Sequence, residues 1–387
     1  MQVCGIIAEF NPFHKGHDRL LTAVREQLPE ARLVCVMSGP FTQRGEPAIL
    51  DKWARAEAAV AAGMNVVFEL HSAWATASLQ SFSFGAVKTL AATGMVTHLA
   101  FGSESGNLPE LNRMAALLQR PTATFQQALK AALAKGAPFA IAQQGALEMA
   151  CGARGLQSRP NDRLAISYLR FAPTDWTALA VQRDTCHDGA LSARAIRQAL
   201  QQNRLPANYL TTESASQLKK ATTNGWLWPH LADFYTALQL RLINLPVAEI
   251  SRITGCSEGM AVRLRRAART AESFDAWLDT ALDRHLFETT LSRAALQLLL
   301  PVSTPAQVPY LRVLAADAEG RRCLRAIQQT ASTPLVTNTG RDGKKLTSKA
   351  QAALQADVAR QEATRLLQTA PAYRRPMRDY YEPPRMV

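Results

Sequence analysis

The sequence predicts an α/β protein with an N-terminal Rossmann-like parallel sheet and a C-terminal, mostly α-helical domain. Over the first 200 or so residues, short apolar runs alternate with patterns of helical period, which is typical of parallel βαβ units. After about residue 205 only helical patterns recur. The net charge of +13 is also uneven: residues 1–200 hold 19 basic and 15 acidic side chains, and residues 201–387 hold 25 and 16. Such asymmetry favours an RNA-binding half joined to a catalytic half.

Five strands can be placed in order in the first part. They are predicted at 3–8, 33–37, 66–70, 98–102 and 177–183, with helices at 17–28, 50–62 and 80–93 and a helical insert at about 108–152. Parallel sheets bind ligands outside the carboxyl ends of their strands. These ends are also the most polar and glycine-rich stretches of this part, namely 9–17, 38–47, 69–74 and 101–106.

The second part is expected to be helical. The predicted helices span 218–245, 247–270, 274–285, 289–300 and 349–367, with a small extended segment around 333–339. We therefore expect a catalytic domain over 1–205, a helical, basic domain over 206–370 and a flexible tail over 371–387.

Composition excludes several classes of protein. With 387 residues, 47% of them hydrophobic and 19% charged, the chain is long enough for a large core. No apolar run reaches the ~18 residues of a membrane span. The six cysteines form no C-x-x-C pair, so no structural zinc site is expected; they are residues 4, 35, 151, 186, 256 and 323. Cys4 and Cys35 fall in apolar strand-like runs, so we expect them to be buried free thiols of a cytoplasmic protein. The sequence does not indicate an oligomeric state.

The first twenty residues, MQVCGIIAEFNPFHKGHDRL, carry the main chemical signal. A buried strand, an Asn-Pro turn and a helix follow one another, so that His14 and His17 lie at the helix N-terminus. That place favours phosphate, and two imidazoles with Lys15 can stabilise charge at an α-phosphate. Gly16 lets the backbone approach a nucleotide closely. The alternatives are a zinc half-site or ordinary loop histidines.

These residues resemble a known group of enzymes. N-P-F-H-K-G-H after a first strand is similar to the H-x-G-H signature of the nucleotidyltransferase superfamily. The longer string G-I-I-A-E-F-N-P-F-H-K-G-H, with M-S-G-P-F-T-Q-R-G-E-P-A at 37–48, resembles the bacterial tRNA(Met) cytidine acetate ligase family. The resemblance implies a nucleotidyltransferase-type sheet domain and a tRNA-binding helical domain. It also implies a ligase that activates acetate with Mg-ATP to acetyl-adenylate and then acetylates the wobble cytidine of elongator tRNA(Met).

The resemblance also implies particular residues. His14, His17 and Lys15 would be catalytic, and no protein metal ligand is expected. ATP would be bound by Gly102, Asn161, Arg183 and the run Ile7, Ala8, Glu9, Phe10, Asn11, Pro12, Phe13, His14, Lys15, Gly16, His17, Asp18, Arg19 and Leu20.

Some of these positions have ordinary structural explanations. Gly102 alone is typical of a turn, and Asn161 of a helix N-cap. The segment Ser192–Arg197 matches one that meets the β- and γ-phosphates in the superfamily, although Arg194 stands where the family usually has threonine.

The loop 38–47 is a candidate site for the small carboxylate. Arg44 would be its cation, and Phe41 with the Gly-Pro turn would wall the pocket. A turn held by a local contact between Arg44 and Glu46 is the alternative.

Four arginines follow Ser257-Glu258-Gly259, a segment that looks family-like, as does Pro309–Leu314. They are spaced over two helical turns and favour RNA phosphate contacts, with a solvated surface as the alternative; they are Arg263, Arg265, Arg266 and Arg269. Two other functions fit parts of this sequence. A small-molecule adenylyltransferase fits the histidine motif but leaves the basic second half unexplained. An RNA-binding protein with an inactive nucleotide site leaves the intact histidines unexplained.

Overall fold

The computed structural model describes residues 1–387 apart from 157–158, 184–191, 203, 254 and 284–285. Cys186, one of the six cysteines, lies outside the described residues, as do Thr254 and His285, which fall in the helices predicted at 247–270 and 274–285.

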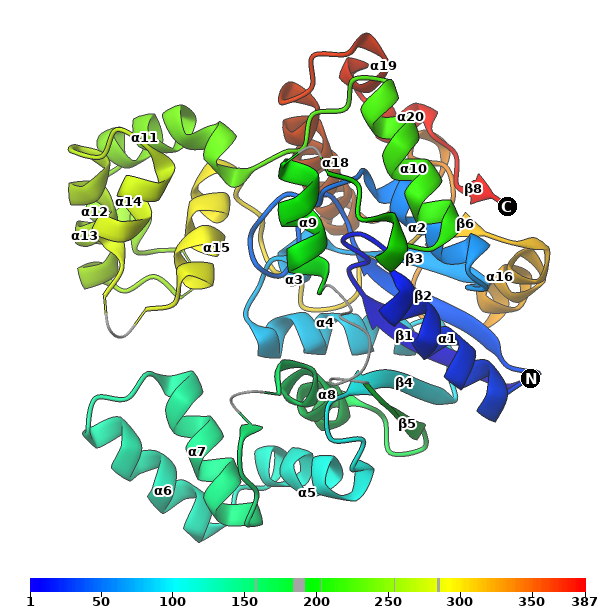
Figure 1. Cartoon of the computed structure of the whole chain (residues 1–387), viewed down its shortest axis with the longest axis horizontal. Coiled ribbons are helices and arrows are strands. Elements are labelled where there is room, and N and C mark those ends of the chain that lie inside the picture. The colour runs from blue at the N-terminus through cyan, green and yellow to red at the C-terminus, as the bar shows by residue number, and fades with distance from the viewer. Residues whose placement is uncertain (157–158, 184–191, 203, 254, 284–285) are drawn as a thin grey trace.

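A twisted sheet forms the centre of the protein, in the strand order β5-β4-β1-β2-β3-β6-β7 (Figure 1). The five predicted strands are confirmed and pair in parallel. Their bounds are β1 Val3–Ala8, β2 Arg32–Ser38, β3 Val66–Leu70, β4 His98–Ser103 and β5 Thr177–Gln182. The central strands are apolar along nearly their whole length because helices cover both faces of the sheet.

Each face of the sheet has its own hydrophobic core. On one face lie α1 (Lys15–Gln27) and α2 (Lys52–Ala61), which bury Leu21, Val24 and neighbouring alanines. On the other lie α4 (Leu79–Ala91), α8 (Pro160–Phe171) and α16 (Ala318–Thr330). A short helix, α3 (Ser72–Ala75), follows β3. The predicted α/β fold is therefore correct.

The insert after β4 is helical, as predicted. It consists of α5 (Leu108–Gln119), α6 (Ala123–Ala134) and α7 (Phe139–Cys151), and it projects from the sheet near α8 in Figure 1. After β5 the chain continues through α9 (Ala193–Gln201), the short helix η2 (Ala207–Tyr209) and α10 (Thr212–Thr223).

A second projection, which we call the helical body, is formed by residues 231–300 (Figure 1). Its elements are η3 Leu231–Phe234, α11 Tyr235–Asn244, α12 Val247–Ile250, α13 Glu258–Ala268, α14 Phe274–Ala281 and α15 Glu288–Leu299. Two predicted long helices, 218–245 and 247–270, are each broken. Gly225, with a left-handed φ of 76°, directly follows the C-cap of α10 and ends that helix, whereas Gly255, with a φ of 81°, lies in the loop between α12 and α13.

Residues 206–370 are mostly helical with an extended segment near 333–339, as predicted, but they also contain a strand that was not predicted. Leu311–Ala316 forms β6, which is antiparallel to β3 and lies in the same sheet. β7 (Leu335–Val336) pairs with it, within the predicted extended segment. The run LRVLAA is apolar on both faces, and such a short run has no period that separates a strand from a helix.

The C-terminal segment is packed rather than a flexible tail. After α17 (Thr339–Gly343) and α18 (Ser348–Leu366), the chain forms α19 (Pro371–Arg374) and α20 (Arg378–Tyr381). β8 (Arg385–Met386) then pairs with β6. The side chain of Asp379 is fully buried, so the predicted tail is part of the folded core.

Among the described residues, no helix is long and apolar enough to cross a membrane. Cys4 and Cys35 are buried free thiols, as expected. The described part of the chain contains no group of three or more His, Cys, Asp or Glu side chains placed to hold a metal ion.

Candidate functional site

The turn between β1 and α1 is built around its two histidines. Phe10 and Phe13 are each 1% exposed and anchor the turn in the core. His14 caps α1, and its Nδ1 accepts a hydrogen bond from the backbone N–H of Gly16 at 3.0 Å. The His14 N–H donates to Nδ1 of His17 at 3.3 Å, and the two rings stack with centroids 3.9 Å apart. With both Nδ1 atoms accepting, each neutral ring carries its proton on Nε2 and can donate it to a ligand.

The electrostatics of the turn favour this neutral form. Burial, reinforced by Arg183 and Arg197, lowers the pKa of His14 to about 4. Burial, with His14 and Arg183 nearby, also lowers the pKa of His17. In the absence of a ligand the two imidazoles are therefore neutral hydrogen-bond donors rather than cations. The positive charge beside them comes from the arginines.

This depressed pKa predicts how stability depends on pH. His14 takes up a proton in the unfolded chain below its ordinary pKa of 6.5, but in the folded protein only near pH 4. Folding stability should therefore fall as the pH drops from 6.5 towards 4, by at most about 3 kcal/mol from this group. His14→Asn keeps an N-cap side chain and removes the titration. Urea denaturation of both proteins at pH 7 and pH 5 should show a smaller loss in the variant; equal losses would contradict the depressed pKa.

Gly102 and Arg183 lie together at the carboxyl ends of β4 and β5. A Cβ on Gly102 would lie 3.3 Å from the Arg183 side chain, and the Arg183 N–H donates to the Ser103 carbonyl at 2.8 Å. Arg183 also lies close enough to His14 and His17 to lower their pKa values. The fold therefore brings three segments predicted to bind ATP to one edge of the sheet.

Asn161 joins the same edge, but it is not the N-cap. The N-cap of α8 is Arg159, whose side chain makes no capping hydrogen bond. Instead Glu104, just after β4, accepts from Asn161 Nδ2 at 2.6 Å and from the backbone N–H groups of Asn161 and Asp162 at 3.1 and 2.8 Å. Sequence analysis missed the role of Glu104, since no local signal links residues 57 positions apart.

Helix α9 reaches back to the histidine turn. Its N-cap is Ser192, whose Oγ accepts from the Ala195 N–H at 3.3 Å. Arg197 Nη1 donates to the Asn11 carbonyl at 2.8 Å, and Arg194 and Arg44 lie near enough to repel it. These arginines place positive charge beside a helix N-terminus, which suits a polyphosphate.

The loop 38–47 lies at this edge too, but not every residue has the predicted place. Its Gln43 N–H donates to Glu9 Oε1 at 2.6 Å, which joins the loop to the histidine turn. Arg44 is exposed, as a ligand contact requires. Phe41, predicted to wall an acid pocket, is instead 1% exposed within the core of the helical body. Its aromatic ring packs against that body, so the prediction that Phe41 walls the acid pocket is wrong.

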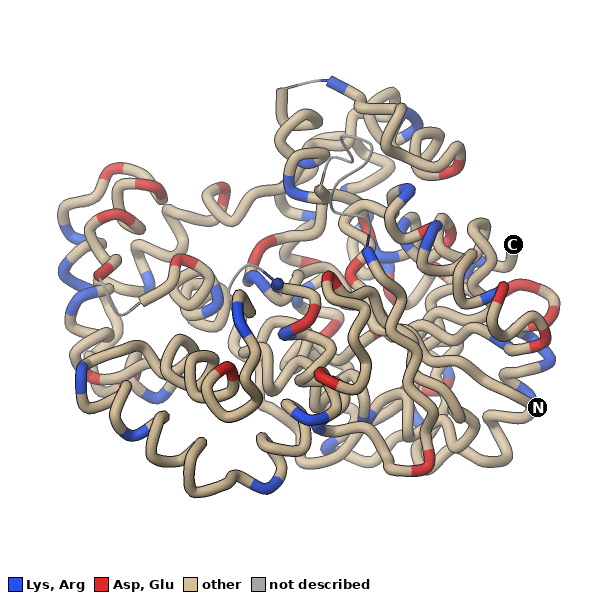
Figure 2. Tube along the Cα trace, turned by 60° about the horizontal axis from the view of Figure 1, so that its bottom comes forward, with Lys and Arg blue, Asp and Glu red and all other residues tan. Residues whose placement is uncertain are grey.

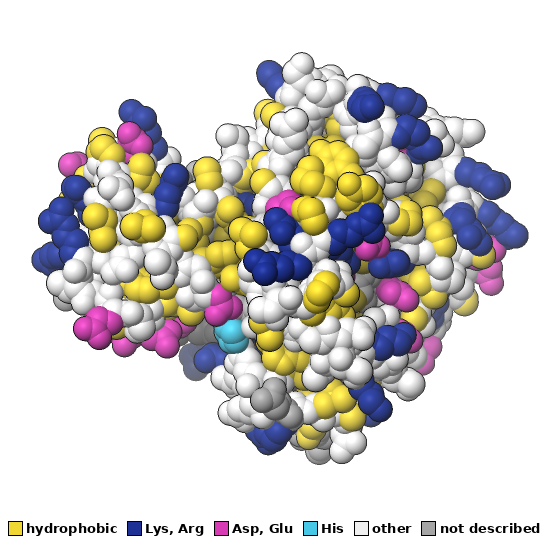
Figure 3. All heavy atoms as spheres, turned by 90° about the horizontal axis from the view of Figure 1, so that it is seen from above, with side chains coloured by type: hydrophobic (Ala, Val, Ile, Leu, Met, Phe, Trp, Pro, Cys, Tyr) yellow, Lys and Arg dark blue, Asp and Glu magenta, His cyan; other side chains and the backbone are white. Residues whose placement is uncertain are grey.

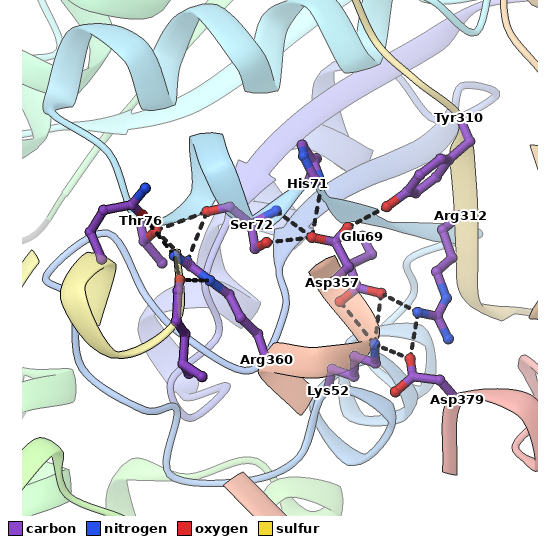
Figure 4. Close-up of polar contacts among 12 residues, drawn as sticks. Lys52, Glu69, His71, Ser72, Thr76, Tyr310, Arg312, Asp357, Arg360 and Asp379 are labelled. Atoms are coloured by element: carbon purple, nitrogen blue, oxygen red, sulfur yellow. Dashed lines mark hydrogen bonds and ion pairs between the residues drawn. The ribbon is translucent and has the colours of Figure 1, made fainter. Parts of the chain in front are cut away.

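A buried ion cluster supports the neighbouring strand end (Figure 4). Lys52 Nζ lies 2.9 Å from Glu69 Oε2 and 2.6 Å from Asp379 Oδ1, and Arg312 pairs with the same two carboxylates. All four side chains are at most 4% exposed. Although burial raises the pKa of Asp379, Arg312 and Lys52 hold it below its usual value.

A second cluster lies beside it, also shown in Figure 4. Asp357 accepts hydrogen bonds from the Ser72 N–H at 2.9 Å and from Tyr310, and His71 Nδ1 lies 2.8 Å away. Arg360 donates to Thr76 Oγ1 at 2.7 Å and to the Leu300 carbonyl. These contacts join α18 to α3 and to the end of α15, so both clusters hold the C-terminal part of the chain on the sheet.

A strand, an H-x-G-H turn and a capped helix, with Gly102, Asn161 and Arg183 at the same sheet edge, define a nucleotidyltransferase of the HIGH class. Residues 1–379 match the family model for the HIGH nucleotidyltransferases. Within that class the chain belongs to the tRNA(Met) cytidine acetate ligase family.

Two curated relatives and one solved structure illustrate this membership. The chain is 35% identical over 356 residues to the tRNA(Met) cytidine acetate ligase of Syntrophomonas wolfei, covering 85% of each chain. It is 33% identical over 359 residues to that of Thermotoga petrophila, again covering 85% of each. The crystal structure of Thermotoga maritima TmcAL bound with alpha-thio ATP superposes with a TM-score of 0.92 at 29% identity, over 100% of both chains. The comparisons do not favour a small-molecule adenylyltransferase.

Proposed function

We propose that this protein activates acetate with Mg-ATP and transfers the acetyl group to N4 of the wobble cytidine of elongator tRNA(Met), in the cytoplasm. The observation that carries the proposal is the assembly of His14, His17, Gly102, Asn161 and Arg183 at one sheet edge in a member of this ligase family.

In the first step an acetate oxygen attacks the α-phosphorus of ATP, and diphosphate leaves. The Ile7–Leu20 segment, Gly102, Asn161 and Arg183 hold the nucleotide, and Lys15 lies exposed at the start of α1. His14 and His17 offer Nε2–H donors to the α-phosphate oxygens, where negative charge builds up in the transition state. Arg183, Arg194 and Arg197 balance the charge of the departing diphosphate.

In the second step the cytidine N4 amine attacks the acetyl carbonyl carbon. The new C–N bond replaces the bond to AMP, which leaves, and the amine loses its proton. The base has to leave its stack to reach a nucleotide pocket. No side chain becomes acylated.

ATP–diphosphate exchange with a series of carboxylic acids tests the proposal, with and without tRNA. Exchange should require acetate, and its rate should fall with butyrate and longer acids. Each methylene that the pocket does not accommodate weakens transition-state binding by about 1–3 kcal/mol. Acetyl transfer should require a tRNA with cytidine at the wobble position. Exchange supported equally by long acids, or adenylation of a small molecule in place of tRNA acetylation, would contradict the proposal.

One basic edge of the helical body is the candidate surface for the RNA. Figure 2 marks Lys and Arg positions along the outer edge of this body, where Figure 1 places α13, and Figure 3 shows Lys and Arg side chains there. Arg266 and Arg269 are exposed there, whereas Arg263 pairs with Asp283 and Arg265 is half-buried. We therefore assign RNA phosphate contacts to Arg266 and Arg269 first among the four arginines.

Replacing Arg266 and Arg269 together by Ala should weaken tRNA binding and flatten its salt dependence. Each lost phosphate contact lowers the slope of log K against log salt by about 0.7–0.9. Filter binding between 50 and 200 mM salt measures this. Arg321 and Arg325, both exposed on α16, form a matched control pair whose replacement should leave the slope unchanged. Equal slopes for the Arg266/Arg269 variant and wild type would place the RNA surface elsewhere.

A further inference from the structure

The loop 38–47 is a closed, well-anchored unit. Phe41 and Pro47 form an antiparallel bridge, and the Thr42 N–H donates to the Glu46 carbonyl at 2.9 Å. The buried guanidinium of Arg55 donates to the carbonyls of Ser38 and Gly39 at the loop's start. The loop is therefore held in its conformation both by its own hydrogen bonds and by those from Arg55.

One side of this loop contacts the nucleotide site. The Gln43 N–H donates to Glu9 Oε1 at 2.6 Å, and Gln43 Nε2 donates to the Ala77 carbonyl at 3.0 Å. Arg55 also donates to the Glu9 carbonyl at 2.7 Å. The end of β1 and the loop are therefore tied together by both main-chain and side-chain atoms.

The same loop also contacts the helical body. Phe41 belongs to the core of that body, and its ring centroid lies 6.5 Å from that of Phe234. Gly45 has a left-handed φ of 83° and packs directly on α15. A Cβ there would lie 2.7 Å from the Arg293 backbone nitrogen and 2.8 Å from the Ser292 carbonyl carbon. Because these are backbone atoms, a side chain at residue 45 would force α15 away.

We propose that Phe41 and Gly45 are positioning residues that set the helical body, and the RNA on it, at the right distance from the acetyl-adenylate. The inference rests on the proposed function and deepens it. We call the contact of Phe41 and Gly45 with the helical body the joint. The joint is proposed to affect the second half-reaction, the transfer of the acetyl group to the base, rather than the formation of the adenylate. Transfer depends on this distance because a misplacement of 1 Å between reacting groups can lower a rate about 10²-fold.

Gly45→Ala tests the joint, with Gly63→Ala as a matched control. Gly63 has a comparable left-handed φ of 105°, but a Cβ there would meet nothing within 4 Å. Both variants therefore carry the same kind of backbone strain, and only Gly45→Ala pushes on α15. Phe234→Ala loosens the joint from the helical side and serves as a second variant if Gly45→Ala folds poorly.

Two rates and one affinity are measured for each folded protein. The rates are those of acetate-dependent ATP–diphosphate exchange without tRNA and of single-turnover acetyl transfer from preformed adenylate to tRNA. The affinity is that for tRNA. Gly45→Ala should lower transfer at least tenfold more than exchange, with tRNA affinity within about twofold of wild type. Phe234→Ala should show the same split with exchange at the wild-type rate, and Gly63→Ala should show no split.

The outcomes separate this inference from the proposed function. A wild-type protein that does not acetylate tRNA overturns the proposed function, and this inference with it. An active wild type beside Gly45→Ala and Phe234→Ala variants that transfer normally, or that lose exchange and transfer equally, overturns the positioning role alone.

Discussion

Replacing His14 or His17 by Ala should lower the rate of acetate-dependent ATP–diphosphate exchange by about 10²–10⁴-fold, the range typical of a positioned proton donor or charge stabiliser. Both rings are locked in the tautomer that presents Nε2–H, through Nδ1 contacts with the backbone at 3.0 and 3.3 Å. The loss should appear mainly in kcat, since the charge that these donors meet develops in the transition state.

Two controls separate chemistry from folding in that experiment. His14→Asn preserves an N-cap for α1, so it should fold like the wild type and still lose exchange. His230→Ala removes an exposed histidine of the chain segment leading into the helical body and should leave exchange at the wild-type rate. A well-folded double variant at His14 and His17 that exchanges at the wild-type rate would rule out the proposed mechanism.

Replacing Asp379 by Ala should destabilise the fold by about 3–5 kcal/mol, because it leaves Lys52 and Arg312 buried with only one carboxylate. This is a large part of the 5–15 kcal/mol that separates a typical folded domain from its unfolded state. The midpoint of urea unfolding, followed by circular dichroism, measures the change.

Arg322→Ala is the matched control for that prediction. Arg322 pairs with Glu319 at 2.6 Å, but its side chain is 74% exposed, and surface pairs contribute about 0–1 kcal/mol. Its removal should therefore hardly move the midpoint. A similar, small shift for the Asp379 variant would mean that the C-terminal segment does not stabilise the sheet through its ion pairs.

The histidine turn and the strands around it could be predicted because their signals are local. The strand at 3–8, the Asn-Pro turn and the two histidines follow one another within twenty residues, and each is visible as an apolar run, a turn pair or a helix start. The five parallel strands were found for the same reason. No local sequence pattern predicts an ATP-binding role for Gly102, Asn161 or Arg183. The family resemblance implies that role, and the fold brings the three residues to the same sheet edge.

Other features were decided only by contacts between distant parts of the chain. Glu104, not Asn161, satisfies the N-terminus of α8, from 57 residues away. Phe41 lies within the predicted ligand loop 38–47, yet its ring packs in the core of the helical body. Neither residue type nor spacing shows which of two neighbouring surfaces such a side chain will cover.

The sequence by itself determined the parallel half of the sheet, the histidine turn and the helical nature of the two projections, because periodicity and turn chemistry act over a few residues. Only the tertiary structure decided that Leu311–Ala316 returns to the sheet as β6 and that the last residues are core rather than tail. Asp379 meets Lys52 across 327 residues of chain. A carboxylate in a polar, proline-rich terminus looks like solvated surface until two buried cations are brought beside it, and their charge is what makes its burial favourable.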